Sequence, residues 1–244
     1  MTVTATRRPA LTSRALAQMI DISAVQAFHT EADIRTLAEI GAAHGFIAAH
    51  ALPHFAPLLR SLLPRRGPTL VGGPVGFPSG GHATSIKVAE ARRLVQDGAD
   101  ELDMMINVGR LKSGDVAYVQ DEVGAVVEVV APKPLKVILE IAYLTDDEIK
   151  QACEIAVIVG AAFVKTGTGW TQGGASVERV RLITGFVKGA VGVKASGGIR
   201  SLDTIAAMVG LGVTRFGVNT KAAVDLVRQC AALPGETLPI PADL

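Results

Sequence analysis

The chain has 244 residues, of which 49% are hydrophobic and 19% are charged, and its formal net charge is +1. A charge near zero argues against a general nucleic-acid-binding protein, and no apolar run approaches the roughly 18 residues that a membrane span requires. The two cysteines, Cys153 and Cys230, form no C-x-x-C pair, so we expect neither a disulfide framework nor a thiolate metal site.

Short apolar runs recur along the chain, separated by polar turns and helical patterns. Each run is too short for a helix and too continuous for a half-exposed strand, which predicts strands buried on both faces, as in a parallel sheet. One strand is predicted at residues 19–21, after a short N-terminal helix, and seven more at 46–51, 69–77, 101–106, 135–140, 163–166, 191–194 and 214–218.

The helices predicted between these strands have marked ends, at residues 30–45, 84–98, 145–160 and 201–210. Thr145 and Glu148 form a capping box, in which a hydroxyl and a carboxylate satisfy backbone donors reciprocally. Gly160 and Gly45 are typical of left-handed helix stops.

Eight strand–helix units predict a single-domain (β/α)8 TIM barrel over residues 1–244, with residues 1–9 and 233–244 as peripheral tails. A doubly wound open sheet is the alternative fold. No G-x-G-x-x-G motif follows the first strand, which favours the barrel.

Five charged residues stand at the ends of predicted strands: Asp21, Asp103, Glu140, Lys165 and Lys194. Active sites of such barrels lie at the C-terminal ends of the strands, where a buried charge is unfavourable unless it is paired. Buried Lys–Asp pairing is the purely structural interpretation. Two lysines and two acids on neighbouring strands favour a catalytic one.

Lys165 and Lys194 lie on consecutive predicted strands, so both side chains can enter the same barrel mouth. A Schiff-base lysine needs a neutral amine, and burial and a nearby cation both lower its pKa. Lys194 would supply that cation to Lys165. Asp103, two strands earlier, is placed to relay a proton to or from a substrate hydroxyl.

Glycine-rich turns after the last two strands predict an anion site. Gly197 and Gly198 let backbone N–H groups approach a ligand in front of a helix N-terminus. Gly217 near the end of the last strand, with Asn219 and Thr220 just after it, would complete the anion site.

Other polar and aromatic residues give weaker indications. His50, His54 and His82 lack the spacing of metal ligands on one helix, so we expect no metal. Phe77 and Trp170 either line a pocket or pack in the core.

Five segments resemble the deoxyribose-phosphate aldolase family: GFPSG, GADELDMMINVGRLKSGD, LKVILE, GAAFVKTGTG and GVKASGGIR. The similarity extends from residue 16 to residue 227. It implies a class I aldolase on a (β/α)8 barrel, with no metal or organic cofactor. By motif position, Lys165 matches the Schiff-base lysine, Lys194 the lysine that perturbs it, and Asp103 the proton-relay acid.

The implied reaction is the reversible cleavage of 2-deoxy-D-ribose 5-phosphate to acetaldehyde and D-glyceraldehyde 3-phosphate. We expect the substrate and phosphate contacts from Asp21, Ser23, Thr166, Gly167, Thr168, Gly197, Gly198, Gly217, Asn219 and Thr220. The chain departs from the family pattern here. Gly167 replaces the serine of K-T-S-T-G, the pair Asn219-Thr220 replaces Ser-Ser, and Ser23 replaces the threonine of D-x-T.

The changes at Gly167 and Asn219, together with Ile141 in place of the threonine after the strand-five glutamate, leave open a related Schiff-base aldolase for a different or unphosphorylated substrate. A catalytically idle barrel that binds a sugar phosphate is the other alternative, and the presence of Lys165, Lys194 and Asp103 together argues against it. Besides the aldehyde and sugar-phosphate substrates, we expect a homo-oligomer, either a dimer or a tetramer, and no nucleic-acid or membrane partner. The N-terminal sequence lacks the apolar core of a secretory signal, and the cysteine usage is cytosolic, so we expect a cytoplasmic protein.

Overall fold

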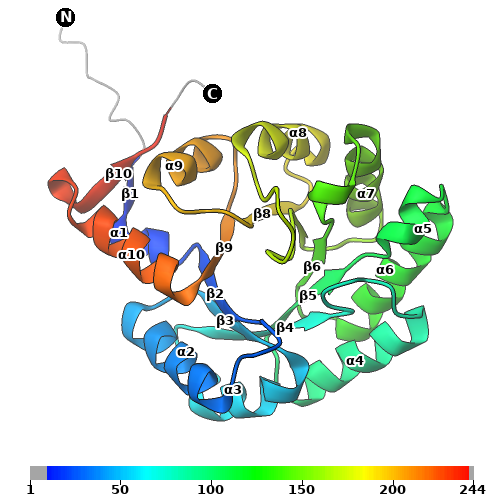
Figure 1. Cartoon of the computed structure of the whole chain (residues 1–244), viewed down its shortest axis with the longest axis horizontal. Coiled ribbons are helices and arrows are strands. Elements are labelled where there is room, and N and C mark those ends of the chain that lie inside the picture. The colour runs from blue at the N-terminus through cyan, green and yellow to red at the C-terminus, as the bar shows by residue number, and fades with distance from the viewer. Residues whose placement is uncertain (1–9, 242–244) are drawn as a thin grey trace, which may run out of the picture.

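Eight parallel strands close a barrel in the computed structural model, which describes residues 10–241 (Figure 1). The predicted (β/α)8 barrel is therefore confirmed, and the doubly wound open sheet is excluded. The strands follow one another around the barrel in sequence order: β2 (Ile20–Ala24), β3 (Ala48–Ala51), β4 (Leu70–Val75), β5 (Glu101–Met105), β6 (Leu135–Ile138), β7 (Phe163–Lys165), β8 (Gly192–Ser196) and β9 (Arg215–Asn219).

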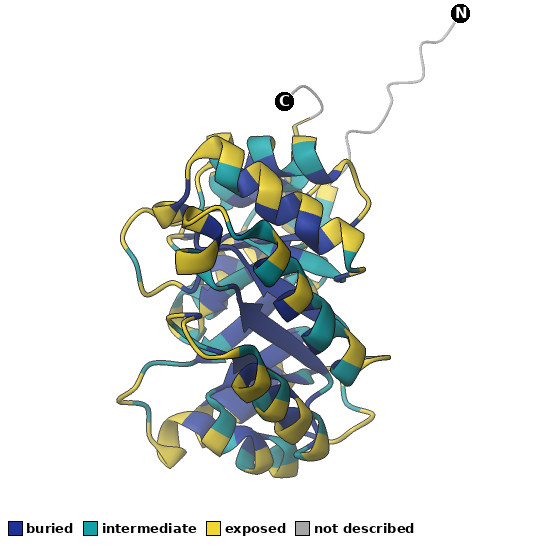
Figure 2. Cartoon of the chain, turned by 90° about the vertical axis from the view of Figure 1, so that its right-hand side faces the viewer, coloured by how far each residue is buried: buried dark blue, intermediate teal, exposed yellow. Residues whose placement is uncertain are grey.

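Helices surround the barrel and turn one face toward it. Figure 2 shows buried strands at the centre and exposed residues on the outer faces of the helices. The helices are α1 (Ser13–Ala17), α2 (Glu31–His44), α3 (Ala56–Leu62), α4 (Thr84–Gln96), α5 (Val108–Lys112), α6 (Val116–Val130), α7 (Asp146–Ile158), α8 (Val177–Val187), α9 (Leu202–Gly210) and α10 (Thr220–Ala231).

Local sequence signals account for the helix ends. At the start of α7, the Thr145 hydroxyl accepts from the Glu148 N–H at 3.3 Å, and the Glu148 carboxylate accepts from the Thr145 N–H at 2.7 Å. Gly45 ends α2 in the left-handed conformation at φ 64°. The predicted capping box and glycine stop are both present.

The strand side chains alternate between two environments, because successive residues of a strand point to opposite faces. Leu102 and Val164 belong to the apolar core between strands and helices. Their neighbours Asp103 and Lys165 form an ion pair inside the barrel. The alternation of apolar and charged residues therefore places an apolar core outside the barrel and a charged cluster within it.

Five strands are shorter than the apolar runs predict, and two of these end near a residue in the left-handed conformation. The run 69–77 stops being a strand after Val75, because Gly76 turns the chain at φ 64°. The run 135–140 stops after Ile138, because Glu140 adopts a left-handed conformation at φ 55°. Both departures occur at the C-terminal mouth of the barrel.

A two-stranded antiparallel ribbon of β1 (Ala10–Thr12) and β10 (Thr237–Pro239) lies outside the barrel. The predicted tail 1–9 is outside the described residues. The described part of the predicted tail 233–244 contains β10, which buries Leu238. Across residues 10–241, no helix has both the length and the apolar character needed to cross a membrane.

Candidate active site

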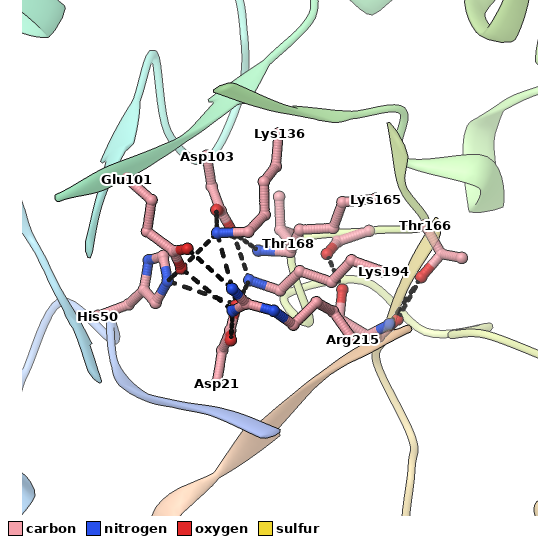
Figure 3. Close-up of polar contacts among 12 residues, drawn as sticks. Asp21, His50, Glu101, Asp103, Lys136, Lys165, Thr166, Thr168, Lys194 and Arg215 are labelled. Carbon is pink, nitrogen blue, oxygen red and sulfur yellow. Dashed lines mark hydrogen bonds and ion pairs between the residues drawn. The ribbon is translucent and has the colours of Figure 1, made fainter. Parts of the chain in front are cut away.

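Asp103, Lys165 and Lys194 converge inside the barrel, as Figure 3 shows. Lys165 on β7 and Lys194 on β8 are register partners, so their side chains leave the same face of the sheet. Asp103 on β5 reaches them from the far side of β6. The order of the strands thus brings together three residues that are up to 91 positions apart.

Asp103 connects the two lysines. Its Oδ2 accepts hydrogen bonds from Lys165 Nζ at 2.8 Å and from Lys194 Nζ at 2.6 Å. Its Oδ1 accepts from Lys136 Nζ at 3.2 Å. The side chain of Lys165 is 11% exposed and that of Lys194 only 2%. Both lysine nitrogens therefore lie in one compartment, with Lys165 the more accessible.

The surroundings set the protonation of this group. Burial lowers the pKa of Lys165, Asp103 opposes that effect, and Lys194 adds to the lowering, so that the pKa falls to about 8. Burial raises the pKa of Asp103, but Lys136, Lys165 and Lys194 outweigh it and hold this pKa well below its usual range. At neutral pH Asp103 is therefore a carboxylate, and a fraction of Lys165 is a free amine.

Asp21 holds Lys194 from the opposite side. Its Oδ2 lies 2.6 Å from Lys194 Nζ and 3.6 Å from Lys136 Nζ, while Oδ1 pairs with Arg215. Burial raises the pKa of Asp21, yet Lys194, Lys136 and His50 lower it well below its usual value. A buried carboxylate with these partners orients Lys194, and its charge is unsuited to direct contact with a phosphate.

Glu101 completes the cluster. It pairs with Lys136, accepts from Arg215 Nη2 at 3.2 Å and lies 3.1 Å from His50 Nε2. Burial raises the pKa of Glu101, and Lys136 together with His50 lowers it to about 2. Asp21 partly opposes the lowering.

The cluster is balanced in charge without a protonated Lys165. Three carboxylates (Asp21, Glu101 and Asp103) face three other cations (Lys136, Lys194 and Arg215). A protonated Lys165 would add a fourth positive charge to three negative charges, which agrees with its lowered pKa.

Asp21, His50 and Glu101 also offer three ligand atoms within 4.8 Å of one another. Lys136 and Arg215, however, already contact the two carboxylates. Their positive charges oppose a metal cation at the same place. The geometry therefore favours an ion-pair cluster over a metal centre.

A cavity of about 450 Å³ opens above the charged cluster, within the size range of small-molecule sites. Asp103, Lys165 and Lys194 all line it. So do eight of the predicted contact residues: Asp21, Ser23, Thr168, Gly197, Gly198, Gly217, Asn219 and Thr220. A Cβ at position 217 would lie 2.7 Å from Ser196 Cβ and 3.3 Å from Lys194 Cε, so this strand position needs a glycine.

One side of the cavity has the character of an anion site. Gly197 and Gly198 have φ values of 91° and 80°, which L side chains rarely adopt. The N-terminus of α10 lines the same cavity, although the Asn219 side chain caps this helix: its Oδ1 accepts from the Ala222 N–H at 3.0 Å. Arg200 and Lys221 line this region too.

Sequence reasoning did not assign Arg200 or Lys221, although Arg200 lies two residues after Gly198 and Lys221 directly follows Thr220. It also missed Lys136, Glu101 and Arg215. The available signal was a charged residue within or beside an apolar strand. That signal is weak, because the partner lies on a distant strand.

The structure does not bring Thr166 and Gly167 to this cavity. The Thr166 hydroxyl donates to the Ser196 carbonyl at 2.7 Å and accepts from the Ser196 N–H at 2.9 Å. The Thr168 residue lines the cavity, but its hydroxyl donates to Glu140. These two hydroxyls therefore fix the protein's own loops.

The chain is similar to known proteins over most of its length. A family model described as DeoC/LacD family aldolase matches residues 17–217. Deoxyribose-phosphate aldolase of Sinorhizobium medicae is 70% identical over 230 residues, covering 94% of this chain and 93% of the relative. That of Klebsiella pneumoniae is 47% identical, covering 91% and 90%. The tetrameric deoxyribose phosphate aldolase structure from Aeropyrum pernix superposes with a TM-score of 0.80 at 28% identity, covering 91% and 94%.

Proposed function

The chain belongs to the DeoC/LacD family of aldolases, and we propose that it is a deoxyribose-phosphate aldolase with Lys165 as its Schiff-base residue. It cleaves 2-deoxy-D-ribose 5-phosphate reversibly to acetaldehyde and D-glyceraldehyde 3-phosphate. The observation that carries the residue assignment is the contact of both lysine nitrogens with one oxygen of Asp103.

The reaction begins with attack of the neutral Lys165 amine on the aldehyde carbon of the open-chain sugar. Loss of water from the adduct gives a protonated imine. The positive charge then lies beside the Asp103 carboxylate, 2.8 Å from Lys165 Nζ in the free enzyme, which stabilises it. The lowered pKa of Lys165 supplies the neutral amine that this step requires.

Cleavage breaks the bond between the α-carbon and the hydroxyl-bearing carbon of the sugar. The electron pair of that bond moves toward the imine and gives a neutral enamine. The hydroxyl gives up its proton and becomes the aldehyde of the departing product. Asp103, a carboxylate in this site, is the group placed to accept that proton, directly or through water. Protonation of the enamine carbon and hydrolysis release acetaldehyde and restore Lys165.

The phosphate binds at the side of the cavity lined by Gly197, Gly198 and the start of α10. Backbone N–H groups and the helix dipole favour an anion there. Arg200 and Lys221 add positive charge and compensate for the hydroxyls that the Asn219-Thr220 pair does not reproduce.

Borohydride trapping tests the assignment. The enzyme is incubated with acetaldehyde or with deoxyribose 5-phosphate and reduced, and the modified peptide is identified by mass spectrometry. We expect adducts on Lys165 with both compounds, none in Lys165→Ala, and normal trapping in the surface control Lys150→Ala. Trapping with acetaldehyde alone would favour an unphosphorylated substrate. No trapping, with sugar-phosphate binding retained in Lys165→Ala, would favour an idle binding barrel.

We further propose that the protein is a cytoplasmic homo-oligomer. The Aeropyrum pernix relative is described as tetrameric, and Ile158 and Tyr143 are large hydrophobic residues exposed on or next to α7. Both cysteines are free thiols, as is usual in a reducing compartment. Light scattering coupled to gel filtration measures the oligomeric state.

A further inference from the structure

Glu140 occupies an unusual backbone position at the mouth of the barrel. The N–H groups of its neighbours, Leu139 and Ile141, donate to the carbonyls of Lys165 and Thr166, each at 2.9 Å. Between these two bonds, Glu140 adopts a φ of 55° and a ψ of 62°. A residue with a Cβ is disfavoured in this left-handed region, and such strain is concentrated at functional sites.

The Glu140 side chain is held by one loop. Its carboxylate accepts from the Thr168 N–H at 3.3 and 3.2 Å, from the Thr168 hydroxyl, and from the Thr171 hydroxyl at 3.1 Å. The residue is 3% exposed. Among residues 10–241, no lysine, arginine or histidine forms an ion pair with it. The buried carboxylate thus depends on hydrogen bonds from the segment 166–171, here named the strand-7 loop.

A chain of contacts leads from Glu140 through the strand-7 loop to the wall of the cavity. The Thr168 hydroxyl, which donates to Glu140, accepts from the Trp170 N–H at 3.0 Å. The Trp170 ring meets Phe77 edge-on, with centroids 5.7 Å apart, and Phe77 lines the cavity. Glu140 is therefore linked through Thr168 and Trp170 to a wall of the substrate site.

Gly167 permits this arrangement. A Cβ at position 167 would lie 2.5 Å from Glu140 Oε1, closer than real Cβ contacts. The carboxylate therefore occupies the space that a side chain would fill next to Lys165. A side chain at position 167 would have to displace the Glu140 carboxylate from its contacts with the strand-7 loop.

We propose that Glu140 is a positioning residue for the aldolase reaction: it holds the strand-7 loop so that Trp170 and Phe77 keep the cavity wall in place for the sugar phosphate. It acts on substrate binding and leaves the nucleophilicity of Lys165 to the charged cluster. The role of Glu140 in sugar-phosphate binding rests on the proposed function. The role of Glu140 in holding the strand-7 loop rests only on the contacts described above.

The first test uses Trp170, which is the only tryptophan of the chain. In Glu140→Gln, the amide NH₂ faces the Thr168 donors, so the loop loosens and Trp170 becomes more exposed. We expect a red-shifted emission and at least about twofold stronger quenching by acrylamide. Asp100→Asn is the control, because Asp100 is a largely buried carboxylate that pairs with Arg60 just before β5, at the opposite end of the barrel from the strand-7 loop. Its emission and quenching should equal those of the wild type.

The second test separates positioning from general destabilisation. For Glu140→Gln we expect KM for deoxyribose 5-phosphate to rise about tenfold, since small displacements of a substrate-contacting wall have effects of this order. The rate of imine trapping with acetaldehyde should stay within about threefold of the wild type. Equal losses in both reactions, or unchanged KM and unchanged Trp170 quenching, would overturn the proposal.

Thr168 provides an independent pair of variants if Glu140→Gln fails to fold. Thr168→Val removes the hydroxyl that joins Glu140 to Trp170, whereas Thr168→Ser retains it. We expect the altered quenching and raised KM in the valine variant and recovery in the serine variant. Equal behaviour of the two variants would contradict the proposal. If the wild type does not cleave the sugar phosphate, the proposed function fails, and the fluorescence measurements still decide whether Glu140 holds the loop.

Discussion

At the residue scale, the lowered pKa of Lys165 results from opposing effects. Burial is the largest contribution to its lowered pKa, Asp103 acts in the opposite direction, and Lys194 adds to the lowering. Proximity to Lys194 alone is therefore an incomplete explanation. Asp103 keeps the two nitrogens close together while it opposes part of the lowering that their proximity produces.

The pH dependence of imine formation tests this explanation. Only the neutral amine attacks an aldehyde, and the pKa of Lys165 is about 8. The single-turnover trapping rate with acetaldehyde should rise about tenfold per pH unit below that value and level off above it. Lys194→Met removes a charge that lowers the pKa of Lys165, so the midpoint should move to higher pH. Lys150→Met, at an exposed position, is the control, and an unchanged midpoint in Lys194→Met would contradict this explanation.

At the scale of elements, a buried ion pair joins α4 to α6 outside the barrel. Lys87 Nζ lies 2.9 Å from Glu122 Oε2 and donates to the Met105 carbonyl at the end of β5, also at 2.9 Å. Both side chains are fully buried. Burial lowers the pKa of Lys87 and raises that of Glu122, so each group needs the other to remain charged.

Removal of one partner should therefore be far more damaging than removal of both. Lys87→Met leaves a buried carboxylate unpaired and should reduce the free energy of unfolding by about 3–5 kcal/mol, most of which Lys87→Met/Glu122→Leu should restore. The deficit of the single variant should shrink as the pH falls, because a protonated Glu122 needs no cation. Lys150→Met, which loses only an exposed pair with Glu154, should change stability by at most about 0.5 kcal/mol. Urea denaturation measures these differences, and equal losses in the single and double variants would contradict the prediction.

At the scale of the whole molecule, the accessibility of the two cysteine thiols measures whether the core is folded. Cys153 and Cys230 are both fully buried free cysteines. Burial, with a smaller contribution from Glu154, raises the pKa of Cys153 to about 12. Burial also raises the pKa of Cys230. Neither thiol is therefore available as a reactive thiolate in the folded protein.

Thiol labelling should follow global unfolding. The native enzyme should react slowly with a thiol reagent, and two thiols should react at once in denaturant. The native labelling rate should increase with urea in parallel with unfolding, because the cysteines become accessible only when the packing opens. Fast labelling of one cysteine, at a rate independent of urea, would show that its helix opens locally.

The sequence by itself predicted the barrel, which the structure confirms, and it placed the proposed reacting residues on the strands that carry them. Short apolar runs between capped helices are local signals, and the order of the strands follows from the order of the chain. Lys165 and Lys194 could therefore be placed on neighbouring strands before any distance was known. The ends of the strands near Gly76 and Glu140 were less predictable. Both residues adopt the left-handed conformation, but each lies within a predicted apolar run, so the hydrophobic pattern does not reveal where the strand stops.

Only the tertiary structure decided which charged groups pair with one another and which polar groups line the cavity. Ion pairs such as Arg215 with Asp21 join residues that are 194 positions apart, and spacing carries no information about them. The hydroxyls of Thr166 and Thr168 look equally available in the sequence, yet Ser196 and Glu140 engage them. Periodicity specifies the face of a strand on which a side chain lies. Which partner satisfies that side chain depends on the closure of the barrel, because closure brings distant strands to face one another across its interior.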